Sequence, residues 1–151
     1  MPRHYERRYL PYGPDEMFDL VADVRRYPEF LPWIMAMRVR SDSDTETIVD
    51  MIVGFKALRE SFTSRVNKTP KGRIVIDYLD GPLKYLHNEW HFASHGDGGC
   101  RIEFEVDFAF RNSVFERLAG QFFETAVTRM IGAFEDRAHA LHGLGSNSSS
   151  A

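Results

Sequence analysis

The chain has 151 residues, of which 43% are hydrophobic and 27% charged, and its formal net charge is −3. This balance is typical of a globular domain, and the acidic charge excludes a general basic field that would attract nucleic acid. The sequence has no apolar run near the roughly 20 residues of a membrane span, no secretory signal at its start and no second cysteine beside Cys100. We therefore expect a cytoplasmic protein without disulfides, with one domain over residues 1–142 and a flexible Gly/Ser-rich tail over 143–151.

The first elements mix extended and helical patterns. A short strand is predicted over residues 4–10, where Pro11 stops it. A helix is predicted over residues 13–24, because a proline and two acidic residues fit its first turn. The segment 27–33, YPEFLPW, is interrupted by two prolines and allows at most one short helical turn.

Six further strands are predicted from side chains that alternate between apolar and polar. They cover residues 34–40, 47–55, 58–66, 72–79, 85–92 and 101–110, and turn-forming residues separate them. The last of these, RIEFEVDFAF, carries three phenylalanines on one face and mostly charged residues on the other. Such a series predicts an antiparallel meander with one covered face.

After residue 111 the apolar residues recur at intervals of three and four, which predicts a long helix to about Ala140. Asn112 or Ser113 is the expected N-cap, with Glu116 near the capping-box position. The sheet and the helix each have one apolar face, so the economical arrangement lays the helix across the concave sheet. A strongly curved sheet does not close flush against one helix, and we expect a gap between them.

These stretches resemble the helix-grip, START-like proteins, and specifically their coenzyme Q-binding and polyketide cyclase/dehydrase-like branch. The matching motifs are YPEFLPW, ESFTSRV, DGPLKYLHNEWHF, CRIEFEVDFAF and the long C-terminal helix. The resemblance implies an α+β fold with a seven-stranded curved antiparallel sheet wrapped around that helix, and two short helices after the first strand. It also implies a hydrophobic tunnel, ubiquinone binding in eukaryotic members and a ribosome-association toxin role for some bacterial relatives, without agreed catalytic residues.

The predicted ligand cavity collects the inward-facing residues of the strands and helices. Methionines suit a flexible guest. Any single aromatic residue on such a face is more typical of an ordinary core, and only the set as a whole indicates a cavity. The predicted set is Phe18, Trp33, Met35, Met37, Met51, Val53, Phe55, Glu60, Phe62, Ile76, Tyr78, Asn88, Trp90, Phe104, Val106, Phe108, Phe122, Val127, Met130 and Phe134.

Glu60 and Asn88 are polar exceptions on the predicted apolar face. One interpretation is that they contact the polar head of the ligand, with Asn88 donating through its amide and a protonated Glu60 donating through its carboxyl. The other is that they lie near strand ends, where they reach solvent or pair with arginine.

Metal binding and cofactor chemistry are not expected. His87, His91 and His95 are spaced by four, but four residues of a strand span about 13 Å, too far to share an ion with ligand distances of about 2 Å. All three share the polar face, and Cys100 is a lone residue at a strand start that we expect to be inert.

The leading hypothesis is a lipid-binding protein that does not catalyse a reaction. Its expected ligand is ubiquinone or a related polyprenyl quinone, and its expected role is that of a carrier or chaperone supporting respiration. Because such a lipid resides in a bilayer, delivery requires transient membrane contact, which allows peripheral association with the inner membrane. Trp33, in the proline-rich segment, suits such an interface.

Two alternatives stay open. A cyclase or dehydratase would need an acid and a base in the cavity, for which Glu60 with Tyr78 is the available pair. A ribosome-associated, toxin-like protein would need a local basic patch, for which the sequence offers Arg25, Arg26, Arg38 and Arg40. No DNA partner is expected, and the sequence alone leaves open the ligand's tail length and the oligomeric state.

Overall fold

The computed structural model describes residues 3–55, 58–69 and 72–143, without the side chains of Phe55, Leu58, Thr69, Ala119, Phe122 and Gly143. The predicted tail, apart from its first residue, lies outside the described residues. Seven antiparallel strands form one curved sheet in the order β1-β7-β6-β5-β4-β3-β2. They are β1 (Arg3–Leu10), β2 (Ile34–Asp42), β3 (Glu46–Phe55), β4 (Leu58–Thr69), β5 (Arg73–Asp80), β6 (Leu83–His95) and β7 (Gly99–Phe110).

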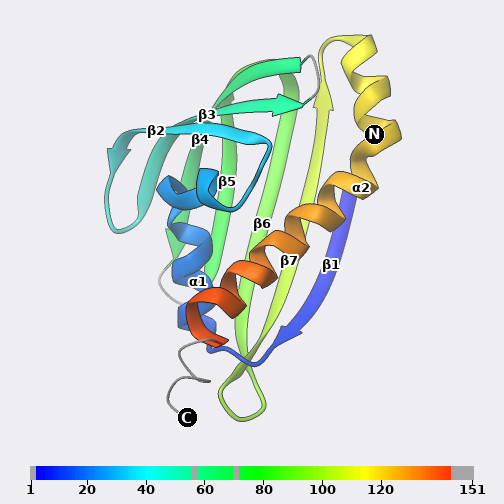
Figure 1. Cartoon of the computed structure of the whole chain (residues 1–151). Helices are drawn as coiled ribbons and strands as arrows, with labels where there is room; N and C mark the ends of the chain where they lie inside the picture. The colour runs from blue at the N-terminus through cyan, green and yellow to red at the C-terminus, as the bar shows by residue number, and fades with distance from the viewer. Residues whose placement is uncertain (1–2, 56–57, 70–71, 144–151) are drawn as a thin grey trace.

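The helices follow the predicted places in the chain. Two short ones, α1 (Pro14–Ala22) and the 3-10 helix η1 (Val24–Glu29), come between β1 and β2. The long helix α2 (Ser113–Ala138) ends in a π-helical turn, η2 (His139–Gly143). It runs diagonally in front of β1, β7 and β6, beginning near the end of β7 and ending beside α1 (Figure 1). The α+β class, the seven strands and the long helix are therefore confirmed.

The start of α2 is fixed by one of the two expected caps. Asn112 Oδ1 accepts hydrogen bonds from the backbone N–H groups of Val114 and Phe115, at 2.8 and 3.2 Å. Glu116 does not complete a capping box, because its carboxylate accepts the Phe110 backbone N–H at 2.8 Å. This carboxylate thus ties the first turn of α2 to the end of β7.

Strand register decides which side chains face α2. Met37, Met51 and Phe62 are consecutive partners across β2, β3 and β4 and lie on the concave side. The expectation that Met35 lies there too is wrong. A register shift between Ile34 and Ala36 turns Ile34 inward, where it is buried, and leaves Met35 48% exposed.

Candidate functional site

The concave side has a sealed end, beneath α1 and the second half of α2. Trp90 lies at its centre and is 6% exposed, with ring centroids of Phe104 at 4.6 Å and Phe134 at 5.2 Å. Phe18 of α1 packs edge-on against Phe92 at 5.9 Å. These aromatic pairs fill the space with the protein's own side chains.

This packing corrects part of the predicted cavity. Trp90, Phe104, Val127 and Phe134 are core residues rather than exposed cavity walls. The small hollow that Trp90 and Phe134 border beneath α2 measures about 20 Å³, roughly the room that one water needs. A guest of lipid size therefore does not fit at the sealed end as it stands.

The other end of the concave side is apolar but only partly covered. We call it the half-covered face; its members face α2, yet each keeps part of its surface exposed. They are Met37, Met51, Val53, Phe62, Ile76, Tyr78, Val106 and Phe108 from the sheet and Met130 from α2. The side chains of Phe55 and Phe122, predicted at this site, lie outside those described. Exposed apolar surface that gathers on one concave side is typical of a ligand site.

The proline-rich segment borders the half-covered face. The Trp33 carbonyl accepts the Gly54 backbone N–H at 2.8 Å, and the next residue, Ile34, pairs with Val53. Trp33 is half-buried, as expected for a residue at the rim. Behind it, burial raises the pKa of the Tyr27 hydroxyl, which donates to the Val21 carbonyl and so fixes η1 against α1.

Asn88 is an internal structural residue rather than a strand-end or arginine-paired one. It is 6% exposed in the middle of β6. Its Nδ2 donates to the Glu105 carbonyl at 2.9 Å, and its Oδ1 accepts the Trp90 indole N–H at 3.1 Å. The amide is therefore engaged in positioning the central tryptophan.

The expected acid and base are not brought together. Tyr78 lies opposite Ser64 of β4, whereas Glu60 is four residues further along that strand, a distance of about 13 Å. The Tyr78 hydroxyl accepts the Leu83 backbone N–H at 2.9 Å. No described residue pairs with the Glu60 carboxylate, which lies opposite Val53 at the open end of the sheet.

A charged strip under α2 was missed by the sequence analysis. His4, Glu6 and Arg8 share the inward parity of β1, and Arg8 Nη1 donates to Glu135 of α2 at 2.7 Å. Burial alone would raise the pKa of Glu6, but hydrogen bonds from His4 and Arg8 outweigh it and hold the pKa below its usual value. The alternation in HYERRYL signals this face, whereas the partner Glu135 is too distant in sequence to be inferred.

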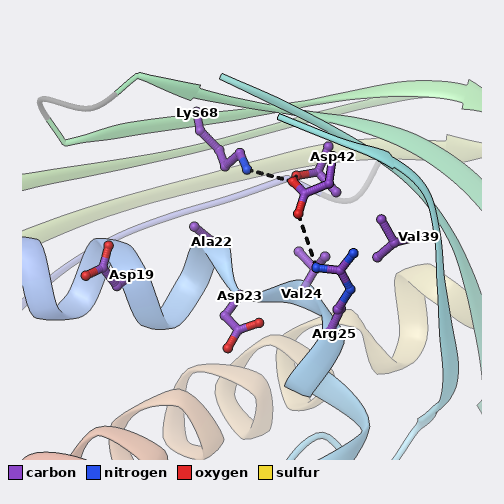
Figure 2. A pocket seen from close by; sticks show the side chains of 9 residues that line it. Asp19, Ala22, Asp23, Val24, Arg25, Val39, Asp42 and Lys68 are labelled. Carbon is purple, nitrogen blue, oxygen red and sulfur yellow. Dashed lines mark hydrogen bonds and ion pairs between the residues drawn. The ribbon is translucent and has the colours of Figure 1, made fainter. Parts of the chain in front are cut away.

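A polar pocket of about 220 Å³ opens at the edge of the molecule between α1, η1 and the sheet. Figure 2 shows Arg25 and Lys68 both pointing at Asp42, at 3.1 Å each. Hydrogen bonds from Thr47 and Lys68 lower the pKa of Asp42. The pocket also holds Asp19 and Asp23, among other residues, so its charges largely cancel.

The predicted basic patch is mostly neutralised. Arg25 pairs with Asp42, Arg40 pairs with Asp50 at 2.8 Å, and Arg26 lies within 3.4 Å of Asp23 and 3.2 Å of Glu29. These ion pairs leave little local positive field for a nucleic-acid backbone.

The histidines lie where the strand parity predicts. His87 and His91 are about half exposed on the convex face, on either side of Glu89, and His95 is exposed at the end of the strand. Within the described residues no group of three His, Cys, Asp or Glu side chains is placed to hold a metal ion. Cys100 is buried, which raises its pKa to about 11 and keeps the thiol protonated near neutral pH.

No helix in the described part of the chain is long and apolar enough to span a bilayer. The curved sheet, the single long helix and the half-covered face together define a START-like, helix-grip fold. A START superfamily protein of Mycobacterium smegmatis shares this fold with a TM-score of 0.76 at 14% identity, over 92% of this chain and 98% of that one.

The chain belongs to the polyketide cyclase/dehydrase and lipid transport family, whose model matches residues 10–135. It is 38% identical to the ribosome association toxin RatA of Rickettsia prowazekii, over 87% of this chain and 92% of that protein. It is 31% identical to the mitochondrial coenzyme Q-binding protein COQ10 homolog B of Xenopus laevis, over 91% of this chain and 58% of that longer protein. Relatives of this chain are thus named both for a lipid and for the ribosome.

Proposed function

We propose that the chain binds ubiquinone or a related polyprenyl quinone on the half-covered face and carries it without catalysing a reaction. The observation that supports this proposal is the gathering of inward-facing but partly exposed apolar side chains on β2, β3, β4, β5, β7 and α2. The methionines among them, Met37, Met51 and Met130, adapt to a flexible isoprenoid tail. The name of the coenzyme Q-binding relative points to the same ligand class.

The energetics favour a carrier over a tight store. Burying a methylene from water contributes about 0.8 kcal/mol, so a five-carbon isoprenoid unit gives roughly 4 kcal/mol before the costs of binding. A bilayer provides nearly the same apolar environment, so moving the tail from membrane to protein gains little. Selectivity then depends on the head group, for which the Tyr78 hydroxyl proton is a suitable donor to a quinone oxygen.

Solvent extraction of protein purified from quinone-producing cells, followed by mass spectrometry, tests the proposal. An add-back titration follows, in which a quinone in detergent quenches tryptophan fluorescence. Met51→Glu places a charge on the half-covered face and is expected to weaken binding at least about tenfold. Ile52→Glu, on the same strand but the opposite face, is the matched control and is expected to bind as the unmodified protein does. Failure both to recover a quinone and to bind one on add-back refutes the proposal.

Ribosome association is the second candidate, favoured by 38% identity to a ribosome association toxin over nearly the whole chain. The paired arginines of η1 and β2 argue against a large electrostatic contribution. Sedimentation with large ribosomal subunits at graded salt tests this candidate. Binding that survives in the Met51→Glu variant would show that any ribosome contact uses another surface.

A further inference from the structure

We infer that the end of the molecule where α2 begins is a docking surface for an anionic lipid bilayer; this inference rests on the proposed quinone-carrier function. The first turns of α2 reach beyond the end of β7 (Figure 1). Val114 is 58% exposed and Leu118 is 37% exposed. Four residues apart on a helix, they lie on one face, so both insert together into an interface.

Exposed basic side chains on this surface favour a bilayer with anionic headgroups. Lys84, Arg111 and Arg117 are exposed around these apolar residues, and no described residue forms an ion pair with them. The Arg111 backbone N–H donates to the Pro82 carbonyl at 3.0 Å, which holds the β5–β6 turn, and Lys84 with it, next to the start of α2. Anionic lipid headgroups are attracted to such a cluster.

The acidic residues of the same surface do not cancel this charge. The carboxylate of Glu116 is half-buried and accepts the Phe110 backbone N–H. Asp80 is then the one exposed acid in residues 79–84 and 111–118, all of which the structure describes. The surface keeps a positive balance beside its exposed aliphatic side chains.

An aromatic path joins this surface to the half-covered face. The Phe115 ring on α2 lies 5.8 Å from Phe110, which lies 5.8 Å from Phe108 of the half-covered face. A lipid leaving the bilayer beside Val114 therefore meets apolar side chains along its route to the proposed site.

The exposed tyrosines of β1 do not fit an anionic bilayer. Tyr5 and Tyr9 are exposed on the convex face of β1, but Glu105 lies directly opposite Tyr5 on β7, and Glu103 is two residues away on the same strand face. Both carboxylates pair with arginines of β1, Glu105 with Arg3 at 3.2 Å and Glu103 with Arg7 at 3.8 Å, so the described residues of this face present no unpaired basic cluster to anionic headgroups. The charge pattern thus assigns the bilayer to the α2 end.

Flotation with vesicles of phosphatidylcholine, alone or with one third phosphatidylglycerol, tests the inference. The full chain is expected to bind the anionic vesicles about tenfold more strongly and to lose this preference in high salt. Arg117→Gln is expected to weaken anionic-vesicle binding about fivefold, whereas Arg129→Gln, on an exposed site further along α2, leaves it unchanged. The double variant Val114→Ser, Leu118→Ser is expected to bind anionic vesicles about tenfold more weakly. Leu141→Ser, at the far end of the long helix, is expected to bind them as the unmodified protein does.

Circular dichroism melting confirms that each variant is folded. Equal binding to both vesicle types, equal effects of Arg117→Gln and Arg129→Gln, or no vesicle binding at all overturns the inference. So does loss of ribosome binding, rather than vesicle binding, in these variants. The quinone titration in detergent separates the two proposals, because unchanged quenching without vesicle binding refutes docking while leaving the carrier function intact.

Discussion

Replacement of Asn88 by leucine is expected to destabilise the protein without weakening ligand binding. The side chain is 6% exposed and is surrounded by the core of the sealed end. It supplies the acceptor for the Trp90 indole N–H at 3.1 Å and a donor to the Glu105 carbonyl at 2.9 Å. Leucine fills a similar volume but can do neither.

The magnitude follows from the buried partners. Each lost hydrogen bond removes about 1 kcal/mol, and a buried indole N–H left without a partner adds a desolvation cost of about 1–3 kcal/mol. We expect the free energy of unfolding to fall by about 3 kcal/mol. For a domain of this size that lowers the melting temperature by about 6–12 °C.

Urea unfolding followed by tryptophan fluorescence and far-UV circular dichroism measures the change, provided that the two transitions coincide. Asn67→Leu is the matched control. Its amide donates to the Val75 carbonyl and to Asp77 on the outer side of the sheet, where water replaces the lost donor. We expect that control to cost less than about 1 kcal/mol.

A double-mutant cycle isolates the bond to Trp90. Trp90→Phe removes the indole donor, so Asn88→Leu should cost about 1–2 kcal/mol less in that background than in the original protein. Additive effects would show that the bond contributes nothing. A folded Asn88→Leu protein with unchanged stability but weaker quinone binding would refute the reasoning and make the amide a ligand contact.

Three other substitutions test further parts of the structure by urea unfolding. Phe134→Ala removes a buried ring from the aromatic core and should cost about 3–5 kcal/mol. Asn112→Ala should lower the free energy of unfolding by about 1 kcal/mol because it uncaps α2, whereas Ser113→Ala should change it very little. A larger loss in Ser113→Ala than in Asn112→Ala would show that Ser113 is the cap. The pKa of Glu6 is below its unfolded value of 4.5, so its charged form contributes stability at neutral pH that is lost as the pH falls below that value. Glu6→Gln should therefore lower stability at pH 7 more than at pH 4, and a pH-independent difference would contradict the assigned cause.

Local periodicity was enough to predict every strand and the long helix. The alternation in residues 101–110 and the spacing of three and four after residue 111 are direct consequences of strand and helix geometry. The exposed position of Met35 was not predictable in this way, because a register shift between Ile34 and Ala36 changes which side chains face inward there. Parity identifies a face and says nothing about bulges, which depend on the partner strand.

The extent of closure was also beyond the sequence. Trp90 and Met51 follow the same inward pattern, yet the first is in a sealed core and the second on an open face. The difference depends on where a diagonal helix crosses the sheet, which no local pattern encodes. Asn88 was assigned to a ligand, to solvent or to an arginine because parity does not show hydrogen-bond partners; these are the tryptophan two residues away and a carbonyl of the neighbouring strand.

The contacts of α2 explain why one end of the concave side is sealed and the other is only half covered. Its second half is held by Arg8 to Glu135 at 2.7 Å and by Arg137 to Glu29 of η1 at 2.9 Å. The Arg137 guanidinium also lies over the ring of Phe30, 5.3 Å from its centroid. The first half is held by fewer polar contacts, chiefly the Glu116 carboxylate at the end of β7. Even so, Phe123 packs against Phe108 of β7 at 5.4 Å and Phe115 against Phe110, so this half of the helix lies on the sheet as well. Because α2 crosses β1, β7 and β6 only (Figure 1), the apolar side chains of β2 to β5 stay partly uncovered.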